Sequence, residues 1–333
     1  MKRFLVLCHD CKAASFRVRW EQHFAPLATA GVACEAREIP TGGGGRAALF
    51  AEAARFDGVV LQRRLLGARD FARLRRAAKF LVYDFDDALL FRPHAPHHSC
   101  KRRNRFFRTV RGADLVLAGN RVLAGYARIG AKNVAVVPST VDTEAIRAAC
   151  DSIRPPAPAP GFRVVWIGQR ATLPHLETVR ATLLEAGRSI PGFVLRVVAD
   201  AAPHGVEFLP WSEEAERQAL ARAHVGIMPL PGDSFARGKC GYKLLLYYAA
   251  GLPAIVSPVG ANRPLAAGGG ALLARTPSDW SAALRRLASD PDLRARLGAR
   301  GRAFVERRYA AHVVPMRLAG LLGADPSPAP ATR

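Results

Sequence analysis

The sequence contains no apolar run of roughly 18 residues, the length that a helix needs to cross a bilayer. This absence argues against a transmembrane helix, although 50% of the residues are hydrophobic. The basic start of the chain is followed by an apolar run at residues 4–8 only, and His9 and Asp10 come directly after it. That run is too short for a signal peptide. We therefore expect a cytoplasmic protein whose first element is a strand.

Cysteine is scarce, and the spacing of the cysteines does not match a complete metal-binding motif. The six cysteines stand at positions 8, 11, 34, 100, 150 and 240, and we expect free thiols in a reducing compartment. Cys8 and Cys11 form one CxxC, which fits either a redox or zinc site or the buried end of a strand. Zinc is disfavoured because no second pair is present. A further group of metal-ligand types lies in a proline-bearing loop: His94, His97, His98 and Cys100. Its irregular spacing makes metal binding the weaker alternative there.

Acidic residues are few, with 27 Asp and Glu against 49 Lys and Arg and a net charge of +22. Residues 1–150 carry 26 basic and 13 acidic residues, and the remainder carries 23 and 14. Such an excess favours anionic partners such as phosphates, nucleic acid or acidic lipid. The preference for Arg over Lys also fits a simple coding bias. Aromatic residues make up only 8%, and no nucleic-acid motif is recognisable, so nucleic acid is a disfavoured partner.

Short apolar runs alternate with longer segments of helical spacing along most of the chain. In the first half, strand-like runs occur at 4–8, 32–35, 58–61, 80–83, 115–118 and 134–137. Segments with helical spacing lie between them, for example at 17–30 and 67–78, and the TGGGG stretch at 41–45 is interpreted as a flexible surface loop. In the second half, strands are expected at 163–167, 194–199, 225–228 and 254–257, with helices at 173–187, 213–223 and 242–250. This alternation predicts parallel sheets covered on both faces.

A stretch rich in Pro and Ala at residues 150–161 separates the two halves and predicts a linker, since proline fixes φ and removes a donor. We predict an α/β chain with two Rossmann-like domains that face each other across a cleft. The N-terminal, acceptor-side domain spans 1–150, the linker 151–161 and the C-terminal domain 162–310. Residues 311–333 form a C-terminal helix and a disordered tail. A ligand held in the cleft is expected.

The most informative stretch surrounds the start of the helix at 242–250. Glycines before a helix let backbone N–H groups approach a ligand, and the helix N-terminus adds partial positive charge. The residues that meet there are Gly238, Lys239, Cys240, Gly241, Tyr242 and Lys243. Two lysines and two glycines at one helix start favour a phosphate cradle over a simple turn. For Gly251 and Pro253, by contrast, a helix stop and a turn are the simpler interpretation.

Residues 226–262 resemble the group 1 glycosyltransferases, the retaining GT-B family of glycogen-synthase and bacterial mannosyltransferase type. The resemblance extends to VVWIG at 164–168, DFDDA at 84–88, ADLVLAGN at 113–120 and VPSTVD at 137–142. It implies a nucleotide sugar, such as a UDP- or GDP-sugar, bound mainly by the second domain. It also implies transfer with retention and without a metal or other cofactor.

One departure from the family pattern concerns the donor loop. The family's usual pair of glutamates is missing, and their places hold Gly238 and Leu246. The resemblance assigns the first glutamate to the sugar and the second to the ribose hydroxyls. Lys239 and Lys243 are the candidates to take over part of that role. A catalytically inactive relative that serves as a binding or partner protein is therefore an alternative to the enzyme.

Further donor-binding candidates follow the first strand of the second domain: Gly168, Gln169, Arg170 and Thr172. A strand-to-helix turn lies at the carboxyl edge of its sheet. The planar fork of Arg170 suits a diphosphate, although an exposed loop arginine is an equal alternative. Arg17 and Arg19 open the first helical segment on the acceptor or phosphate side, and their spacing turns them to different faces.

Asp86 and Asp87 come just after a strand end, where ligands bind in such sheets. In the family, this region faces the sugar or acceptor. We predict that one of the two aspartates orients or deprotonates an acceptor hydroxyl. A helix or turn cap is the alternative role.

Residues 101–111 combine six cations with Phe106 and Phe107. The stretch fits docking on anionic lipid or RNA, or a solvated helix face with its phenylalanines packed inward. The leading interpretation of the whole chain is a hexosyltransferase that acts on a glycan or lipid-linked acceptor, peripheral at the inner membrane. A basic protein that binds nucleic acid or an anionic surface is the remaining alternative.

Overall fold

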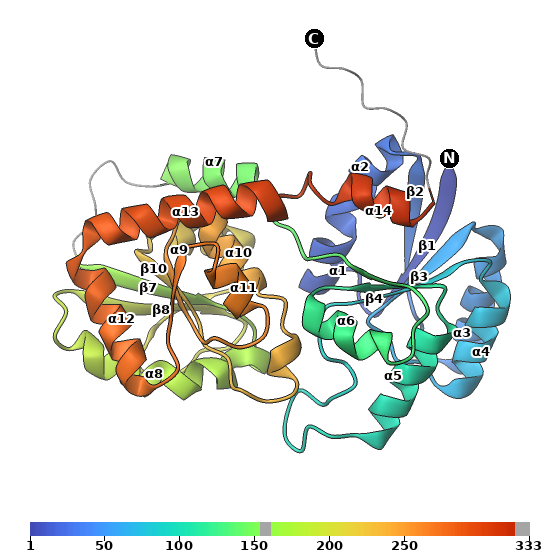
Figure 1. Ribbon diagram of the computed structural model, residues 1–333, viewed down its shortest axis with the longest axis horizontal. Helices are drawn as coiled ribbons and strands as arrows, with labels where there is room; N and C mark the ends of the chain where they lie inside the picture. The colour runs from blue at the N-terminus through green and yellow to red at the C-terminus, as the bar shows by residue number, and fades with distance from the viewer. Residues whose placement is uncertain (154–160, 324–333) are drawn as a thin grey trace, which may run out of the picture. The chain divides into compact units, whose positions relative to one another are not determined.

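The computed structural model describes residues 1–153 and 161–323 and divides the chain into two compact units (Figure 1). The first unit holds Met1–Thr140, Asp233–Cys240 and the C-terminal segment from Ala311. The second unit holds Val141–Gly232 and Gly241–Ala310. The first unit thus includes a short segment, Asp233–Cys240, that sequence analysis placed in the second domain.

The first unit is built on one parallel six-stranded sheet in the order β2-β1-β3-β4-β5-β6. Its strands are β1 (Lys2–Cys8), β2 (Val32–Glu38), β3 (Gly58–Gln62), β4 (Leu81–Phe85), β5 (Leu115–Ala118) and β6 (Val134–Val136). Its helices are α1 (Ala14–Arg19), α2 (Phe24–Thr29), α3 (Gly43–Glu52), α4 (Ala68–Ala77), α5 (Cys100–Gly112), α6 (Arg121–Arg128) and α14 (Pro315–Leu321). Strands β3 and β4 are buried along their whole length, as both-face coverage of a parallel sheet requires.

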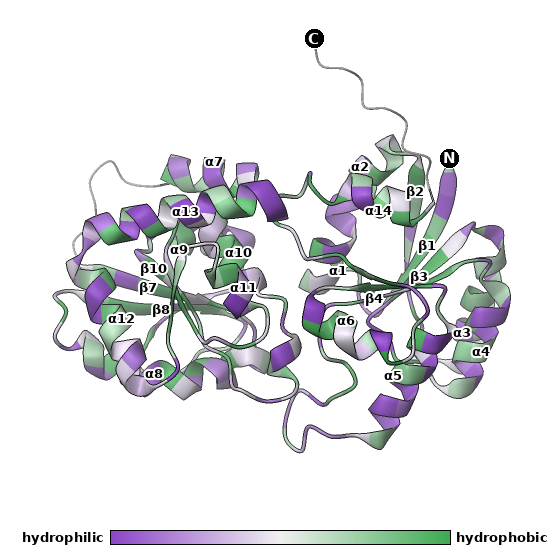
Figure 2. Cartoon of the chain, in the orientation of Figure 1, coloured by the Kyte–Doolittle hydropathy of each residue, from purple (hydrophilic) through white to green (hydrophobic). Residues whose placement is uncertain are grey.

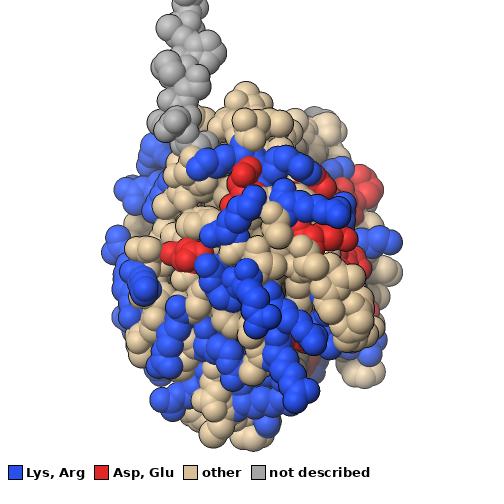
Figure 3. Space-filling model, turned by 90° about the vertical axis from the view of Figure 1, so that its right-hand side faces the viewer, with Lys and Arg blue, Asp and Glu red and all other residues tan. Residues whose placement is uncertain are grey.

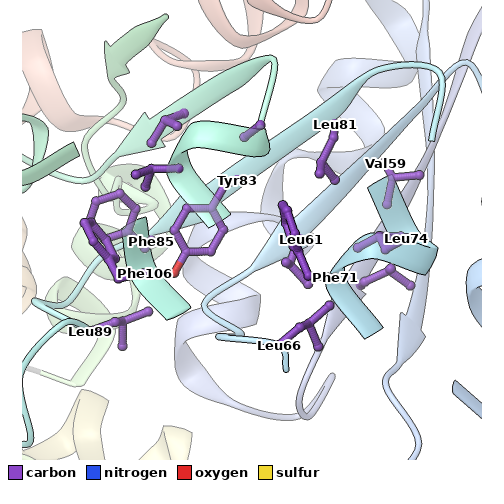
Figure 4. Close-up of a cluster of buried hydrophobic side chains, with 14 of the residues drawn as sticks. Val59, Leu61, Leu66, Phe71, Leu74, Leu81, Tyr83, Phe85, Leu89 and Phe106 are labelled. Carbon is purple, nitrogen blue, oxygen red and sulfur yellow. The ribbon is translucent and has the colours of Figure 1, made fainter. Parts of the chain in front are cut away.

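Apolar side chains fill both sides of this sheet, and Figure 2 shows its strands mostly in the hydrophobic colour. On one face, α3 to α6 contribute to a cluster in which Phe106 of α5 lies edge-on to Tyr83 and Phe85 of β4 (Figure 4). On the other face, α1, α2 and α14 pack through Phe16, Leu27 and Leu318. The last helix thus returns to the first unit.

The second unit has a parallel six-stranded sheet in the order β12-β11-β10-β7-β8-β9. Its strands are β7 (Phe162–Ile167), β8 (Phe193–Ala199), β9 (Glu207–Pro210), β10 (Val225–Met228), β11 (Ala254–Val256) and β12 (Ala271–Leu273). Its helices are α7 (Thr143–Ile153), α8 (Leu173–Gly187), α9 (Glu213–Arg222), α10 (Tyr242–Ala249), α11 (Asn262–Ala266), α12 (Pro277–Ser289) and α13 (Pro291–Tyr309). The predicted fold class is confirmed, because each unit is a parallel sheet with flanking helices.

Two local expectations are wrong. The TGGGG loop is partly helical: α3 begins at Gly43, because Leu49 and Phe50 bury its later turns and Arg46 pairs with Asp70 of α4. The Pro-rich stretch is also helical at its start, since α7 continues to Ile153 and buries Cys150. The rest of the predicted linker (154–160) and the predicted disordered tail (324–333) lie outside the described residues.

The expected helical segment at 17–30 is broken into shorter pieces. Helix α1 ends at Arg19, a 3-10 turn covers Glu21–His23, and α2 follows. Trp20 at this break has φ −133° and is fully buried. Tertiary packing of Trp20 thus interrupts a segment whose periodicity alone predicts a continuous helix.

Each sheet has a point at which the strand order reverses, and ligands bind outside the carboxyl ends of the strands at such points. In the first sheet the reversal lies between β1 and β3, and in the second between β7 and β10. A ligand-binding site is therefore expected near the residues that follow β3 and β7.

Candidate functional site

At the carboxyl edge of the first sheet, Arg63 holds both aspartates of the predicted pair. Arg63 follows β3, and Asp86 and Asp87 follow β4. Its guanidinium donates from Nη1 to Asp86 Oδ1 at 2.6 Å and from Nη2 to Asp87 Oδ2 at 2.8 Å. Arg63 has φ 59°, the left-handed region, which costs a non-glycine residue about 1–3 kcal/mol. Such strain clusters at functional sites, and sequence analysis missed this arginine.

Lys239 extends the same ion-pair network from the segment Asp233–Cys240. Its Nζ lies 3.0 Å from Asp87 Oδ1 and 5.0 Å from the ring centroid of Phe235. Phe235 is buried in the cluster that α3 to α6 cover. The network therefore contains two cations and two carboxylates in one chain of contacts.

Close packing fixes the backbone of this segment against the edge of the first sheet. Asn120 caps α6 and donates from Nδ2 to the carbonyl of Gly238 at 2.9 Å. A Cβ on Gly238 would lie 2.6 Å from the Cβ and 2.8 Å from the backbone N of Ala88. The thiol of Cys240 donates to the Asp86 carbonyl at 3.1 Å. Glycine is thus required at position 238 because the backbone there packs closely against Ala88, and not only because the chain turns.

The two aspartates differ in their electrostatic surroundings. Burial raises the pKa of Asp86, and the Arg63 guanidinium opposes this only in part. Burial also disfavours ionised Asp87, but Lys239 and Arg63 together outweigh it and hold the pKa of Asp87 below its ordinary value. Surroundings that shift the pKa values of two neighbouring carboxyl groups in opposite directions are typical of acid and base sites.

Arg19 has a structural role in place of the predicted phosphate contact. Its side chain is 2% exposed and forms an ion pair with Asp84, which also accepts from the indole of Trp20 at 2.9 Å. Arg19 also donates to the carbonyl of Val137 at 2.5 Å. The Arg19 guanidinium is therefore occupied by partners inside the first unit. Arg17 is half-buried on α1.

In the second unit, the turn after β7 carries four predicted donor-binding residues. Gly168 leaves no room for a Cβ against the Trp166 ring. Gln169 and Thr172 form a capping box around a short 3-10 turn. The backbone N–H of Arg170 donates to Asp200, and the Arg170 side chain is exposed. The side chains of Gln169, Thr172 and Asp200 thus hold the turn, and the Arg170 side chain stays exposed.

The start of α10 holds the other predicted donor-binding residues of this unit. Gly241 has φ 78° and serves as N-cap, and Tyr242 is the first residue of the helix. Lys243 Nζ lies 5.2 Å from the Trp166 ring centroid, so α10 and the end of β7 meet there. Tyr247 fixes α10 on the sheet, because its hydroxyl donates to Ile227 of β10 at 3.1 Å.

A polar group that sequence analysis did not single out lies beside Gly241. Asn262 is fully buried, and its Nδ2 donates to the carbonyls of Met228 and Ser257 at 3.3 and 3.0 Å. Its Oδ1 has no hydrogen-bond partner among the described residues. A Cβ on Gly241 would lie 3.7 Å from this oxygen. Buried acceptors are rarely left unpaired, which marks Asn262 as a candidate ligand contact.

The predicted site residues thus fall into two groups. Gly238, Lys239 and Cys240 join Asp86 and Asp87 in the first unit, whereas the residues after β7 and Gly241, Tyr242 and Lys243 belong to the second. Among residues 1–153 and 161–323, no three His, Cys, Asp or Glu side chains stand together as a metal site. In the CxxC, the two sulfurs lie 3.2 Å apart, and Cys8 is buried at the end of β1.

Comparison with known proteins identifies a family and several solved structures that this chain resembles. The family Glycosyl transferases group 1 matches residues 144–290. No curated protein matches the chain in sequence. HepE of Anabaena, solved with UDP and glucose, has a TM-score of 0.73 at 14% identity, and the match covers 98% of this chain and 100% of HepE.

Two further solved structures agree in fold. Sucrose-phosphate synthase from Thermosynechococcus elongatus has a TM-score of 0.73 at 15% identity, over 96% of this chain and 98% of that one. WaaG, a glycosyltransferase involved in lipopolysaccharide biosynthesis, has a TM-score of 0.65 at 14% identity, over 97% of this chain and 100% of that one. The resemblance seen in the sequence is therefore confirmed: residues 144–290 match the group 1 glycosyltransferase family, and the chain has the GT-B fold of these solved structures.

Proposed function

We propose that the chain is a retaining hexosyltransferase that moves a sugar from a nucleotide-sugar donor, such as a UDP- or GDP-sugar, to a glycan or lipid-linked acceptor. The observation that carries the proposal is the start of α10, which lies inside the region that matches the family. There a left-handed glycine precedes the helix, and Lys243 stands beside Trp166 at the end of β7. A helix N-terminus with a lysine suits a diphosphate. The solved complexes of HepE with UDP and UDP-glucose support this donor class.

Within this proposal, the residues after β7 and those at the start of α10 bind the donor. The exposed fork of Arg170 and the ammonium of Lys243 hold the diphosphate, and the buried Asn262 oxygen accepts a donor hydroxyl or amide. Asp86 or Asp87 receives the acceptor hydroxyl. An inactive binding protein remains a second candidate, because Gly238 and Leu246 stand where the family has glutamates.

An Lys243→Ala variant should bind nucleotide sugars about 10- to 100-fold more weakly. The reason is the loss of a charge-assisted contact of about 1.5–3 kcal/mol. Isothermal titration calorimetry with UDP-glucose and GDP-mannose measures this directly. Lys79→Ala, which removes an exposed lysine of the first unit, is the matched control. Equal donor affinity in both variants would remove Lys243 from the site.

We propose in addition that the first unit docks on an anionic membrane through α4 and α5. No helix in the described part of the chain is long and apolar enough to span a bilayer. Figure 3 shows Lys and Arg gathered over the lower part of the first unit's outer face, with Asp and Glu mostly above them. The exposed cations of α4, α5 and the turn after α4 are Arg69, Arg73, Arg76, Lys79, Lys101, Arg103 and Arg111. The acidic residues nearby, Asp70 and Asp114, are already paired with Arg46 and Arg75.

The wild-type protein should sediment with vesicles of anionic lipid at low salt and release them at high salt. Each cation near the surface contributes about 1 kcal/mol, and salt screens this attraction. A variant with Arg69, Arg73 and Arg76 changed to Gln should bind at least tenfold more weakly. The control carries the same charge loss at three exposed arginines of the second unit, Arg222, Arg285 and Arg307. An equal loss of vesicle binding in both variants would show that the attraction comes from the overall charge of the protein and not from α4.

A further inference from the structure

One half-buried cation of the first unit has no anion beside it. Arg64 follows Arg63 directly after β3, at the carboxyl edge of the first sheet. Arg63 donates to two aspartates, whereas the Arg64 side chain has no hydrogen-bond or ion-pair partner among residues 1–153 and 161–323. Partial burial of a charge without an opposite charge is unfavourable. An unpaired arginine at the ligand edge of a sheet therefore points to an anionic ligand.

The charged groups that act on Arg64 are themselves cations. Burial lowers the pKa of the Arg64 guanidinium, and the charges of Arg46 on α3 and Arg105 on α5 lower it further. Arg46 is partly neutralised, because its Nε lies 2.8 Å from Asp70 Oδ2. Arg64 has no such carboxylate in the described part of the chain. Since a guanidinium stays protonated at neutral pH, its positive charge remains available to an anion.

Helix α5 brings two further arginines to the same edge. Arg105 donates from Nη1 to the carbonyl of Leu65 at 3.3 Å, so its guanidinium lies beside the residue that follows Arg64. Arg102 lies one turn earlier on the same face of α5, where burial and neighbouring cations, including Arg63, lower its pKa. Neither Arg102 nor Arg105 has a carboxylate partner among the described residues, and both are half-buried. Arg64, Arg102 and Arg105 thus form an arginine cluster without counter-ions of its own.

We propose that the arginine cluster binds a phosphomonoester group carried by the sugar acceptor. This inference rests on the proposed sugar transfer and names the acceptor class as a phosphorylated glycan. A phosphomonoester carries up to about two negative charges and three terminal oxygens, which guanidinium forks bind in pairs. It therefore matches several arginines better than a carboxylate with a single charge does.

The arginine cluster differs from the cations of α4 and α5 that we propose for the membrane. Those side chains are exposed, whereas all three members of the cluster are half-buried. Half-buried guanidinium groups suit a small ligand group at the edge of the sheet, and exposed ones suit a flat surface. The cluster also lies near the reversal of strand order between β1 and β3, and all of it belongs to the first unit.

Isothermal titration calorimetry of the full chain with glucose 6-phosphate and mannose 6-phosphate tests this site. Arg64→Gln should raise the Kd of the tighter probe at least about tenfold, because it removes a charge-assisted contact. Arg64→Lys should give a smaller loss, since lysine keeps the charge without the fork. The matched control is Arg76→Gln, which removes an exposed arginine from the last turn of α4 and should change this Kd less than about twofold. An equal loss in Arg76→Gln and Arg64→Gln would overturn the proposal.

Further ligands identify what the arginine cluster recognises. The parent sugars and glucuronate should bind at least about tenfold more weakly than the better sugar phosphate. Glucuronate that binds as tightly would overturn the choice of phosphate over carboxylate. Inorganic phosphate that binds more tightly than both sugar phosphates would indicate a site for the free ion and overturn the acceptor assignment. Vesicles of phosphatidylglycerol should bind Arg64→Gln and the wild type equally, and a large loss in the variant would assign the cluster to the membrane instead.

Two more variants locate the bound phosphate. Circular dichroism and thermal unfolding identify a variant that does not fold, and Arg105→Gln then replaces Arg64→Gln, with the same loss expected. Lys243→Ala alters the donor side of the second unit and should keep the affinity of the wild type for sugar phosphates. A larger loss in Lys243→Ala than in Arg64→Gln would place the phosphate on the second unit and contradict the proposal.

Consumption of UDP-glucose separates this inference from the proposed function. If the wild type consumes UDP-glucose but binds sugar phosphates independently of Arg64, sugar transfer stands and the acceptor assignment is wrong. If sugar phosphates bind through Arg64 but no nucleotide sugar is consumed with them or with water, the proposed function fails. In that case the phosphate site stands, and its role in holding an acceptor falls with the function.

Discussion

An Asp84→Ala variant should lose about 3–5 kcal/mol of unfolding free energy, the largest stability effect that we expect from a single substitution in the first unit. Asp84 is fully buried and accepts from Arg19 and from the indole of Trp20. Without the carboxylate, the Arg19 guanidinium is left buried and uncompensated. Because most domains are stable by only about 5–15 kcal/mol, the first unit should come close to unfolding at 37 °C.

Urea unfolding followed by circular dichroism measures this loss. Asp70→Ala is the matched control, because it breaks the partly exposed pair between Asp70 and Arg46. That variant should lose about 1 kcal/mol or less. If Asp84→Ala were no less stable than Asp70→Ala, the Arg19–Asp84 pair would not support the fold as we describe.

A Gly238→Ala variant should lose most of the transferase activity, at least about 100-fold, while the chain stays folded. The added Cβ would lie 2.6 Å from the Cβ of Ala88 and 2.9 Å from Leu123 Cδ2. The nearby backbone N of Ala88 cannot yield, so the segment Asp233–Cys240 must shift. That shift breaks the bond from Asn120 to Gly238 and separates Lys239 from Asp87. Misplacing catalytic groups by about 1 Å costs roughly 100-fold in rate.

Gly232→Ala provides the control for this prediction. It lies on the same loop, has no atom within 4 Å of an added Cβ and needs no left-handed backbone. Its activity and thermal unfolding should match the wild type. If Gly238→Ala were as active as Gly232→Ala, close packing of this segment on the first sheet would not be needed for function.

The fold was largely predictable because parallel strands buried on both faces leave continuous apolar runs in the sequence. Residues 58–61 and 115–118 were predicted as strands on that basis, and β3 and β5 are buried throughout. Local errors arose where long-range contacts outweigh local composition. Gly43 starts a helix only because α3 packs on α4 and buries Leu49 and Phe50.

The candidate site was predictable only in part. Asp86 and Asp87 were found because residues after a strand lie at the ligand edge of a parallel sheet. Arg63 follows a strand in the same way, but a lone arginine is not distinctive in a sequence so rich in arginine. Gly238, Lys239 and Cys240 were placed with the donor domain by chain continuity. Their packing on the first unit depends on contacts with Asn120 and Ala88, which sequence order does not reveal.

Proton NMR of the purified protein with UDP-glucose and GDP-mannose tests the central claim most directly. It follows the anomeric proton of the donor and of the released sugar over time. The account predicts that at least one donor is consumed, that the nucleoside diphosphate appears, and that the first sugar signal has the anomeric configuration of the donor. A donor that is consumed with inversion would contradict retention. Donors that remain intact, with unshifted signals at millimolar protein, would contradict the assignment of the chain as a nucleotide-sugar-dependent glycosyltransferase.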